Sequence, residues 1–206
     1  MKVFCIGTWK TGTTSIGRGL EYLLPGKHKS WGFRNLYLKG DYNRLLRISE
    51  GFTSFDDTPW NCKDMIPLLN HKYPSAKFIL PIRDSHEWFE SIQKWYFNDI
   101  LKGPVGKSGK IEMKMYKDKD YSIVGEMYRR QMLPEYDPID MNPISDYKKD
   151  WIDWYELRNS TLITDLGEKV RPIYFSKENP LNWEPICQFL QVPIPEEPFP
   201  ILNENL

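Results

Sequence analysis

The stretch KVFCIGTWKTGTTSIGRGLEYLL, residues 2–24, contains the pattern that decides the fold. Its first part is a short apolar run that ends at Gly7, which is typical of a buried strand. From residue 11 onward the apolar side chains recur at helical spacing, until Pro25 and Gly26 close the segment. The sequence therefore predicts a strand, a glycine-containing loop and a helix, in that order.

Strands and helices continue to alternate along the rest of the chain. Further predicted strands lie at 52–59, 77–82 and 170–176, and further predicted helices at 61–73, 85–97, 145–165 and 183–192. We expect a turn-rich stretch between the first helix and residue 51, and a mobile insertion at the Gly- and Lys-rich segment 102–120. The alternation predicts one α/β domain over residues 1–206, with a central parallel sheet flanked by helices.

Composition and charge exclude several classes of protein. The 28 basic and 28 acidic residues give a net charge of zero, which argues against a general nucleic-acid coat but not against one concentrated anion site. Apolar runs such as 78–82 are far shorter than the roughly 20 residues of a membrane helix. Met1 leads directly into the first strand without a signal peptide, so we expect a soluble, cytoplasmic protein. The three scattered cysteines indicate neither a disulfide framework nor a zinc site.

The loop GTWKTGTTS, residues 7–15, carries the strongest chemical signal. Gly7 and Gly12 keep the glycine spacing of a nucleotide-binding loop, but Thr13 stands where such loops have their lysine. That lysine serves the β- and γ-phosphates, and the hydroxyl beside it holds magnesium. The loop therefore predicts a site for a 5′-phosphate that bears one transferable group, with no metal required. An unrelated glycine turn before a helix is the alternative.

The segment from Lys10 to Thr14 reads K-T-G-T-T. It resembles the 5′-phosphosulfate loop, K-[ST]-G-[TS]-[TS], of sulfotransferases that use 3′-phosphoadenosine 5′-phosphosulfate (PAPS). The resemblance implies a P-loop fold and a donor site, and it gives Lys10 the further task of stabilising the leaving phosphate. The residues implied to bind the donor at this loop are Lys10, Thr11, Gly12, Thr13, Thr14 and Ser15.

Two further motifs extend the resemblance along the chain. In this family an arginine at the end of a strand and a serine eight residues later bind the 3′-phosphate of the donor, and Arg83 and Ser91 match that spacing. The alternative is an ion pair between Arg83 and Asp84 at a helix start, with Ser91 as a solvated hydroxyl. The run WEPICQFL at 183–190 is similar to the W-E-P-[LI]-C-x-F-L signature of a bacterial-type subfamily.

The resemblance also suggests where the catalytic base lies. Many sulfotransferases have a His or Glu at the end of the strand before the arginine strand, and this chain has Asp57-Thr58-Pro59 there. Asp57 is the leading candidate, and Asp56 is the reserve because a one-residue slip of the strand would exchange their directions. A carboxylate near its reference pKa of about 4 is a weak base unless burial or a neighbouring negative charge raises that pKa. A turn or cap before the next helix is the alternative.

Weaker candidates each have a structural alternative. The three aromatic residues Trp9, Tyr174 and Phe175 could stack on adenine, although aromatic residues beside strand ends are more often core. An aromatic face at 147–155 is a sugar-stacking platform or, more commonly, core at helical spacing. For the three histidines, His28, His71 and His86, a structural role is favoured.

The resemblance implies an enzyme that moves the sulfuryl group of PAPS to a hydroxyl or amine of an unidentified small-molecule or carbohydrate acceptor. Adenosine 3′,5′-bisphosphate (PAP) is then the second product. Two alternatives remain at this point. One is a small-molecule phosphotransferase with an unusual P-loop, and the other is a non-catalytic nucleotide-binding protein of the same fold. The partners expected from the sequence are the donor and the acceptor, without nucleic acid.

Overall fold

The computed structural model describes residues 1–95 and 148–202. They belong to two compact units, of which the first contains Met1–Asp84 and the C-terminal part of the chain from Asn159, and the second contains residues from Ser85 to Arg158. Each unit is described by itself. The predicted insertion at 102–120 lies outside the described residues, and the single domain over residues 1–206 stays a prediction.

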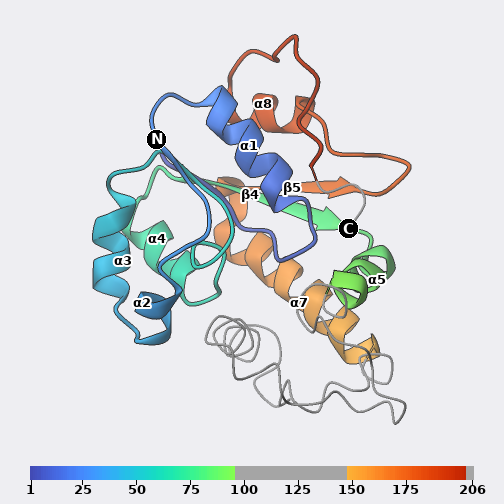
Figure 1. Cartoon of the computed structure of the whole chain (residues 1–206), viewed down its shortest axis with the longest axis horizontal. Helices are drawn as coiled ribbons and strands as arrows, with labels where there is room; N and C mark the ends of the chain where they lie inside the picture. Colours follow the sequence, from blue (N-terminus) through green and yellow to red (C-terminus); the bar gives the residue numbers. More distant parts are fainter. Residues whose placement is uncertain (96–147, 203–206) are drawn as a thin grey trace. The chain divides into compact units, whose positions relative to one another are not determined.

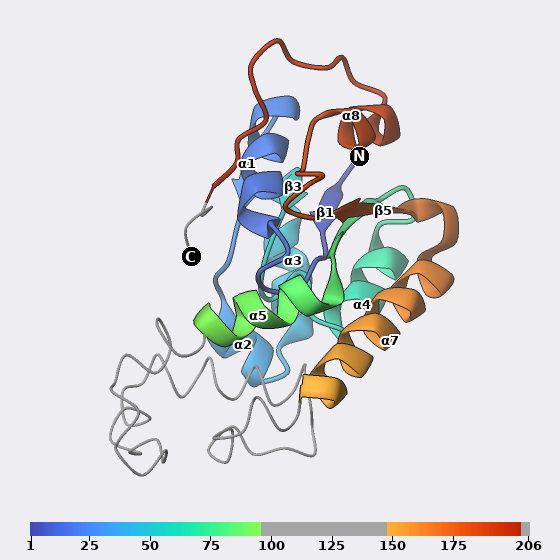
Figure 2. The ribbon, with the colours of Figure 1, turned by 90° about the vertical axis from the view of Figure 1, so that its right-hand side faces the viewer.

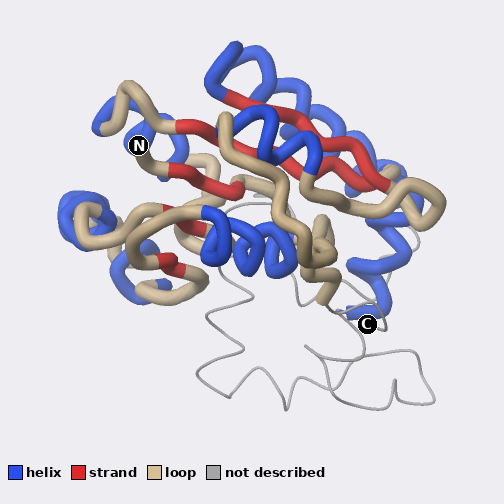
Figure 3. Tube along the Cα trace, turned by 90° about the horizontal axis from the view of Figure 1, so that it is seen from above, coloured by secondary structure: helices blue, strands red, loops and turns tan. Residues whose placement is uncertain are grey.

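The first unit is built on a parallel sheet of five strands (Figure 1). These are β1 (Val3–Cys5), β2 (His28–Lys29), β3 (Ser54–Phe55), β4 (Lys77–Arg83) and β5 (Val170–Phe175), which a short 3-10 helix, η4 (Gly167–Lys169), precedes. Their order across the sheet is β2-β3-β1-β4-β5, and every neighbouring pair is parallel. Viewed from above, the strands lie side by side (Figure 3). The predicted α/β class with a central parallel sheet is confirmed.

One face of the sheet packs against α1 (Thr13–Leu23) and α8 (Glu184–Leu190), which lie on the same side of the strands in Figure 2. Side chains from three strands and both helices form one buried apolar cluster there. Its members include Val3, Cys5, Ile79 and Ile173 from the strands and Ile16, Leu20, Ile186 and Leu190 from the helices. The apolar stripe that predicted the first helix is therefore the face that α1 buries.

The opposite face carries a row of aromatic rings. Because successive side chains of a strand point to opposite faces, Phe4 points away from its neighbours in β1. Phe4 is paired in register with Phe55 on one side and Phe78 on the other, and its ring centroid lies 4.5 Å and 5.5 Å from theirs. Tyr73, directly after α4 (Met65–Lys72), stacks on Phe4 at 6.3 Å. Helices therefore cover both faces, which gives three layers.

Proline lies inside β4, although this strand has a partner on each side. The carbonyl oxygen of Ile79 accepts a hydrogen bond from Ile6 N, beside β1, at 2.8 Å. Because residues two positions apart in a strand have the same orientation, the backbone nitrogen of Pro81 also faces the side of β1. β1 has already ended there, and the missing N–H of Pro81 removes no hydrogen bond from the sheet. A methyl group at Gly7 would lie 2.5 Å from Pro81 Cγ, so only glycine allows the chain to leave β1 this closely.

The stretch between α1 and residue 51, expected to be rich in turns, also holds three regular elements. Besides β2, they are α2 (Arg34–Leu38) and α3 (Tyr42–Ser49). The sequence did not indicate these elements because β2 has two residues and α2 five, and because α3 buries only Leu45 and Ser49, which leaves little apolar periodicity. The Asp41 carboxylate caps α3 by accepting from Arg44 N at 3.2 Å.

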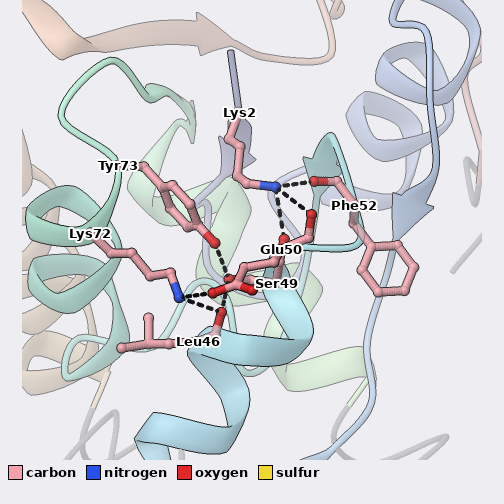
Figure 4. Close-up of polar contacts among 7 residues, drawn as sticks. All are labelled: Lys2, Leu46, Ser49, Glu50, Phe52, Lys72 and Tyr73. Atoms are coloured by element: carbon pink, nitrogen blue, oxygen red, sulfur yellow. Dashed lines mark hydrogen bonds and ion pairs between the residues drawn. The ribbon is translucent and has the colours of Figure 1, made fainter.

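Two lysines satisfy the C-terminal end of α3 (Figure 4). Lys2 Nζ donates to the carbonyl oxygens of Ser49, Glu50 and Phe52 at 2.8, 3.2 and 2.5 Å. Lys72 Nζ forms an ion pair with the Glu50 carboxylate. Carbonyl groups at the end of a helix receive no hydrogen bond from an N–H group within the helix, so the two ammonium groups stabilise this end. Burial lowers the pKa of Lys2.

The second unit contains α5 (Ser85–Trp95) and the first part of α7 (Lys148–Leu166). Trp88 of α5 is fully buried, and its ring stacks on Tyr155 of α7 with centroids 4.1 Å apart. Trp151 is also buried, and its ring centroid lies 6.2 Å from that of Trp88. Trp151 and Tyr155 are therefore core residues and not a sugar-stacking platform. Tyr147, at the start of the same predicted face, lies outside the described residues.

Candidate active site

The loop between β1 and α1, residues 6–12, has a specific conformation. Lys10 and Gly12 both adopt left-handed backbone geometry, with φ of 61° and 74°. Lysine rarely does so, because its Cβ crowds the backbone there. The Thr11 hydroxyl donates to the carbonyl oxygen of Thr8 at 2.6 Å and holds the loop from within. The lysine that was expected to bind the donor therefore lies at a strained position of the loop.

Neighbouring segments hold the same loop from outside. Asn61 Nδ2 donates to the carbonyl oxygen of Gly7 at 2.8 Å. A methyl group at Gly12 would lie 2.5 Å from Leu181 Cδ1, so the second glycine is also required by close packing. Both glycines of the predicted motif are thus explained by the close approach of Pro81 and Leu181, in addition to any role toward a ligand.

The N-terminus of α1 is suited to an anion. Gly12 is the N-cap and supplies no side-chain cap, and the first turn holds no acidic residue. The first backbone hydrogen bond of the helix joins Ile16 N to the carbonyl oxygen of Gly12 at 3.0 Å. The N–H groups of residues 13–15 consequently have no acceptor inside the helix, and the helix dipole adds positive potential at this end. A phosphate or sulfate group matches both features.

Two hydroxyls of this helix end differ in their surroundings. Thr14 is exposed, whereas the Ser15 hydroxyl is buried and accepts from Leu202 N at 2.9 Å. The Ser15 hydroxyl is therefore hydrogen-bonded to the backbone of the C-terminal segment. The N–H group of Ser15 is the part of this residue that suits a phosphate.

Asp57 lies in the turn that follows β3. Its backbone is left-handed, with φ of 58°, and its carbonyl oxygen accepts from Trp60 N at 2.9 Å. The half-buried carboxylate accepts from Thr58 N at 2.7 Å through Oδ1. Burial raises the pKa of Asp57, and the charge of Asp56 raises it further, against the opposing influence of Thr58 and Arg34. Both conditions that a carboxylate needs to become a stronger base are met at this position.

Asp56 has a different environment. Its buried carboxylate lies 3.1 Å from His28 Nε2 through Oδ1, and His28 Nδ1 lies 2.8 Å from Ser54 Oγ. A methyl group at Gly17 of α1 would lie 2.5 Å from Asp56 Oδ2. The carboxylate of Asp56 is thus enclosed by β2 and α1, which makes it a less accessible base than Asp57.

The partnership of His28 with Asp56 was missed from the sequence. Ser54 and Asp56 are two residues apart and therefore share one face of their strand. A buried polar pair on one strand needs a polar partner from a neighbouring strand. That requirement was the available signal for His28, but the two-residue length of β2 concealed the pairing of these strands.

The residues expected to bind the 3′-phosphate fall in different units. Arg83 is the last residue of β4 and is paired in register with Phe175 of β5, at the carboxyl end of the sheet. Ser91 lies on α5 in the second unit, and its side chain is buried. The candidates for stacking on adenine also separate: Phe175 packs against the apolar cluster, Trp9 is half-buried, and Tyr174 is 65% exposed.

Within the first unit, the predicted donor loop and the predicted base come together. β1 and β3 are neighbours and parallel, so the loop after β1 and the turn after β3 leave the same edge of the sheet. The hydrogen bond from Asn61 to Gly7 joins the two segments directly. A carboxylate with a raised pKa thus lies in the turn beside a loop whose helix N-terminus is suited to an anion.

Comparison with known proteins identifies the class to which this site belongs. Residues 2–205 match a family model described as a sulfotransferase domain, so the chain belongs to this sulfotransferase family. It is also 23% identical over 223 residues to the Ava biosynthesis cluster protein M of Aspergillus versicolor, a match that covers 97% of this chain and 80% of that protein. The resemblance of the K-T-G-T-T and W-E-P-I-C motifs to sulfotransferases is confirmed at the level of the family.

No helix in residues 1–95 or 148–202 is long and apolar enough to cross a membrane. Within these same ranges, no three His, Cys, Asp or Glu side chains are grouped so that they could hold a metal ion.

Proposed function

We propose that this protein transfers the sulfuryl group of PAPS to a hydroxyl or amine of a small-molecule acceptor and releases PAP. Membership of a sulfotransferase family supports the reaction class. The observation that carries the choice of donor is the β1–α1 loop, where Lys10 takes the place of the usual P-loop lysine and adjoins an uncapped helix N-terminus. Such a loop suits a single 5′-phosphosulfate better than a triphosphate with magnesium.

Donor binding is assigned to named groups. Lys10 and the N–H groups of residues 11–15 hold the 5′-phosphosulfate, and the hydroxyls of Thr13 and Thr14 are further donors. The sequence motif assigns the 3′-phosphate to Arg83 and Ser91. No metal ion is required in this scheme, since Lys10 and the helix N-terminus supply the positive charge.

Transfer needs a base and a stabilised leaving group. The carboxylate of Asp57 accepts the proton of the acceptor hydroxyl as the acceptor oxygen attacks sulfur. The new S–O bond forms while the bond between sulfur and the 5′-phosphate oxygen breaks. Negative charge develops on that phosphate oxygen, and the Lys10 ammonium stabilises it. The proton remains on Asp57 until solvent removes it, and the products are a sulfate ester and PAP.

A small-molecule acceptor is favoured over a polymer. The similar Aspergillus versicolor protein is named for a biosynthesis cluster. The net charge of zero on this chain also gives no general attraction for a polymer that already carries many sulfates.

Incubation with PAPS labelled in the sulfuryl group, together with a mixed panel of alcohols, phenols and amines, tests the proposal. We expect label in a new product, equal in amount to the PAP released, without added metal. The variant Asp57→Asn removes the base and should lower turnover by roughly 100-fold or more, while PAP still binds.

The two alternative functions give different results in the same assay. A small-molecule phosphotransferase would require magnesium and would use ATP instead of PAPS. A non-catalytic nucleotide-binding protein would bind PAP but transfer no label and hydrolyse no PAPS. Full turnover in Asp57→Asn would show that another group is the base.

A further inference from the structure

Three neighbouring strands of the first unit end at one edge of the sheet, in the order β2, β3, β1. After β1 comes the donor loop, and after β3 comes the turn with Asp57. After β2 comes a short segment, residues 30–34, that no motif identified. We propose that this segment, which we name the 30–34 loop, is the acceptor site, and that the acceptor is an aromatic hydroxy acid. This inference rests on the proposed function and names its second substrate.

Hydrogen bonds place the Asp57 turn between the other two segments. Gly32 N donates to the carbonyl oxygen of Thr58 at 3.1 Å, which joins the 30–34 loop to the residue beside Asp57. On the other side, Asn61 Nδ2 donates to the carbonyl oxygen of Gly7 in the donor loop. The base therefore lies between the donor loop and the 30–34 loop, as a base must that removes a proton from one substrate during attack on the other.

Aromatic side chains dominate the exposed surface of the 30–34 loop. Trp31 is 59% exposed and Phe33 is 36% exposed. Phe33 is anchored by an edge contact with the buried ring of Trp60, with centroids 6.5 Å apart. One exposed ring needs no explanation, but two within three residues, beside a candidate base, form a surface on which a flat ring can pack.

Two cations accompany these rings. Lys29 Nζ lies 5.1 Å from the ring centroid of Phe33, and Arg34 Cζ lies 5.1 Å from that of Trp31. Neither cation forms an ion pair with a carboxylate in the parts of the chain that the structure describes. Arg34 Nε is buried and has no hydrogen-bond partner among those residues. A buried N–H group without an acceptor is uncommon in a folded protein, and an anionic ligand would supply one.

Arg34 is also close enough to Asp57 to oppose the rise in its pKa. The guanidinium of Arg34 and the carboxylate of Asp57 are therefore close enough to contact one ligand. A ligand that reaches both presents an anionic group to Arg34 and a hydroxyl to Asp57. When its anionic group pairs with Arg34, the pull of this cation on the Asp57 carboxylate weakens, and Asp57 becomes a stronger base.

These features select the chemical class of the acceptor. The rings of Trp31 and Phe33 require a flat apolar part, Lys29 and Arg34 require an anion, and a carboxylate base favours a hydroxyl that is already acidic. A phenol, with a pKa of about 10, meets the last condition far better than an aliphatic alcohol. An aromatic ring that bears both a hydroxyl and a carboxylate satisfies all three.

Calorimetric titration with 4-hydroxyphenylacetate and with 4-methylphenol, at saturating PAP, tests the inference. The two probes share the phenol and differ in the carboxylate. We expect the acid to bind roughly tenfold or more tightly than the neutral phenol, because it adds a charge-assisted hydrogen bond. Arg34→Gln should remove most of that difference, and Trp31→Ala should weaken both probes.

Arg171→Gln is the matched control, since Arg171 also stacks on an aromatic ring, Phe189, but lies on β5 at the other edge of the sheet. It should leave both affinities unchanged. Methyl glucoside, a neutral sugar without an aromatic ring, is the third probe and should bind more weakly than the acid. Equal binding of the acid and the neutral phenol, tighter binding of methyl glucoside than of the acid, or no binding of the acid would overturn the inference. Failure of PAP to bind would contradict the proposed function instead, and the same titrations without PAP would then decide the inference, because the 30–34 loop is formed without ligand.

Discussion

The environment of Asp57, the proposed base, has a consequence for stability. Its carboxyl pKa is raised in the folded chain by burial and by Asp56. In the unfolded chain the pKa returns to about 4. Between these two values the folded state binds more protons than the unfolded state, so stability falls as the pH rises through this window. The Asp57 carboxyl group therefore makes the fold less stable at neutral pH than at acidic pH.

Asp57→Asn should raise the thermal unfolding temperature at pH 7 while it lowers turnover by roughly 100-fold or more. Asparagine tolerates the left-handed backbone and can still accept the hydrogen bond from Thr58 N. The gain should vanish below pH 4, where the aspartate is protonated in both states. Asp165→Asn, which removes an exposed carboxylate of α7, is the control and should change little. A variant that is less stable at pH 7 would show that Asp57 is a structural turn residue.

Asp56 should control the pH dependence of its neighbour. With Asp57 as the proposed base, turnover requires its deprotonated form, so we expect the rate to rise as the pH passes upward through its raised pKa. Asp56→Asn removes a negative charge that raises this pKa and should move the rising limb of the pH–rate profile to lower pH. The amide can still bond to His28. An unchanged profile, measured from pH 4 to 9, would mean that Asp56 does not act on Asp57.

At the scale of elements, the aromatic row across β3, β1 and β4 should dominate the stability of the first unit. Phe4 is fully buried between Phe55 and Phe78. Phe4→Ala removes a large ring from this packing and should reduce the free energy of unfolding by about 3–5 kcal/mol, measured by urea denaturation. Tyr174→Ala, at an exposed position of β5, should change it by less than about 0.5 kcal/mol. Similar losses in both variants would contradict the packing described here.

A pair of left-handed glycines, Gly12 and Gly40, allows the packing of the donor loop to be tested separately from its backbone geometry. Their φ angles are 74° and 72°, but only Gly12 has a close neighbour, Leu181. Each change to alanine should cost about 1–2 kcal/mol for the backbone alone. Gly12→Ala should cost more and should also weaken PAP binding, whereas Gly40→Ala should leave PAP binding intact. Equal effects on PAP binding would show that the loop does not hold the nucleotide.

For the whole molecule, the sequence predicted the parts of the fold with strong periodicity. The run around β4 and the stripe of α1 are long enough that burial alone dictates their structure. β2, α2 and α3 were not found, because β2 has only two residues and α2 five, and because the eight residues of α3 bury only Leu45 and Ser49. The 30–34 loop and the His28–Asp56 contact remained hidden for the same reason, since both depend on the position of β2.

The candidate site was predictable to the extent that it is local. Lys10 and Gly12 are neighbours in a motif, so their proximity requires no knowledge of the fold. The direction of Asp57 depends on register, which is why the sequence left Asp56 as an alternative. The proposed acceptor side depends on β2 packing beside β3, a contact between residues 26 positions apart, such as His28 and Ser54. No local motif reports such a contact.

The central claim, that the β1–α1 loop binds a PAPS-type nucleotide without metal, is tested most directly by titrating PAP and ATP with and without magnesium. Lys10→Asn introduces a residue that tolerates the left-handed backbone and replaces the long ammonium side chain with a short neutral amide. Lys27→Asn, at an exposed position near the amino ends of the strands, is the control. We predict that PAP binds equally well with and without magnesium, and that its affinity falls roughly 10- to 100-fold in Lys10→Asn alone. Binding of ATP only, or PAP affinity that Lys10→Asn leaves unchanged, would contradict the account.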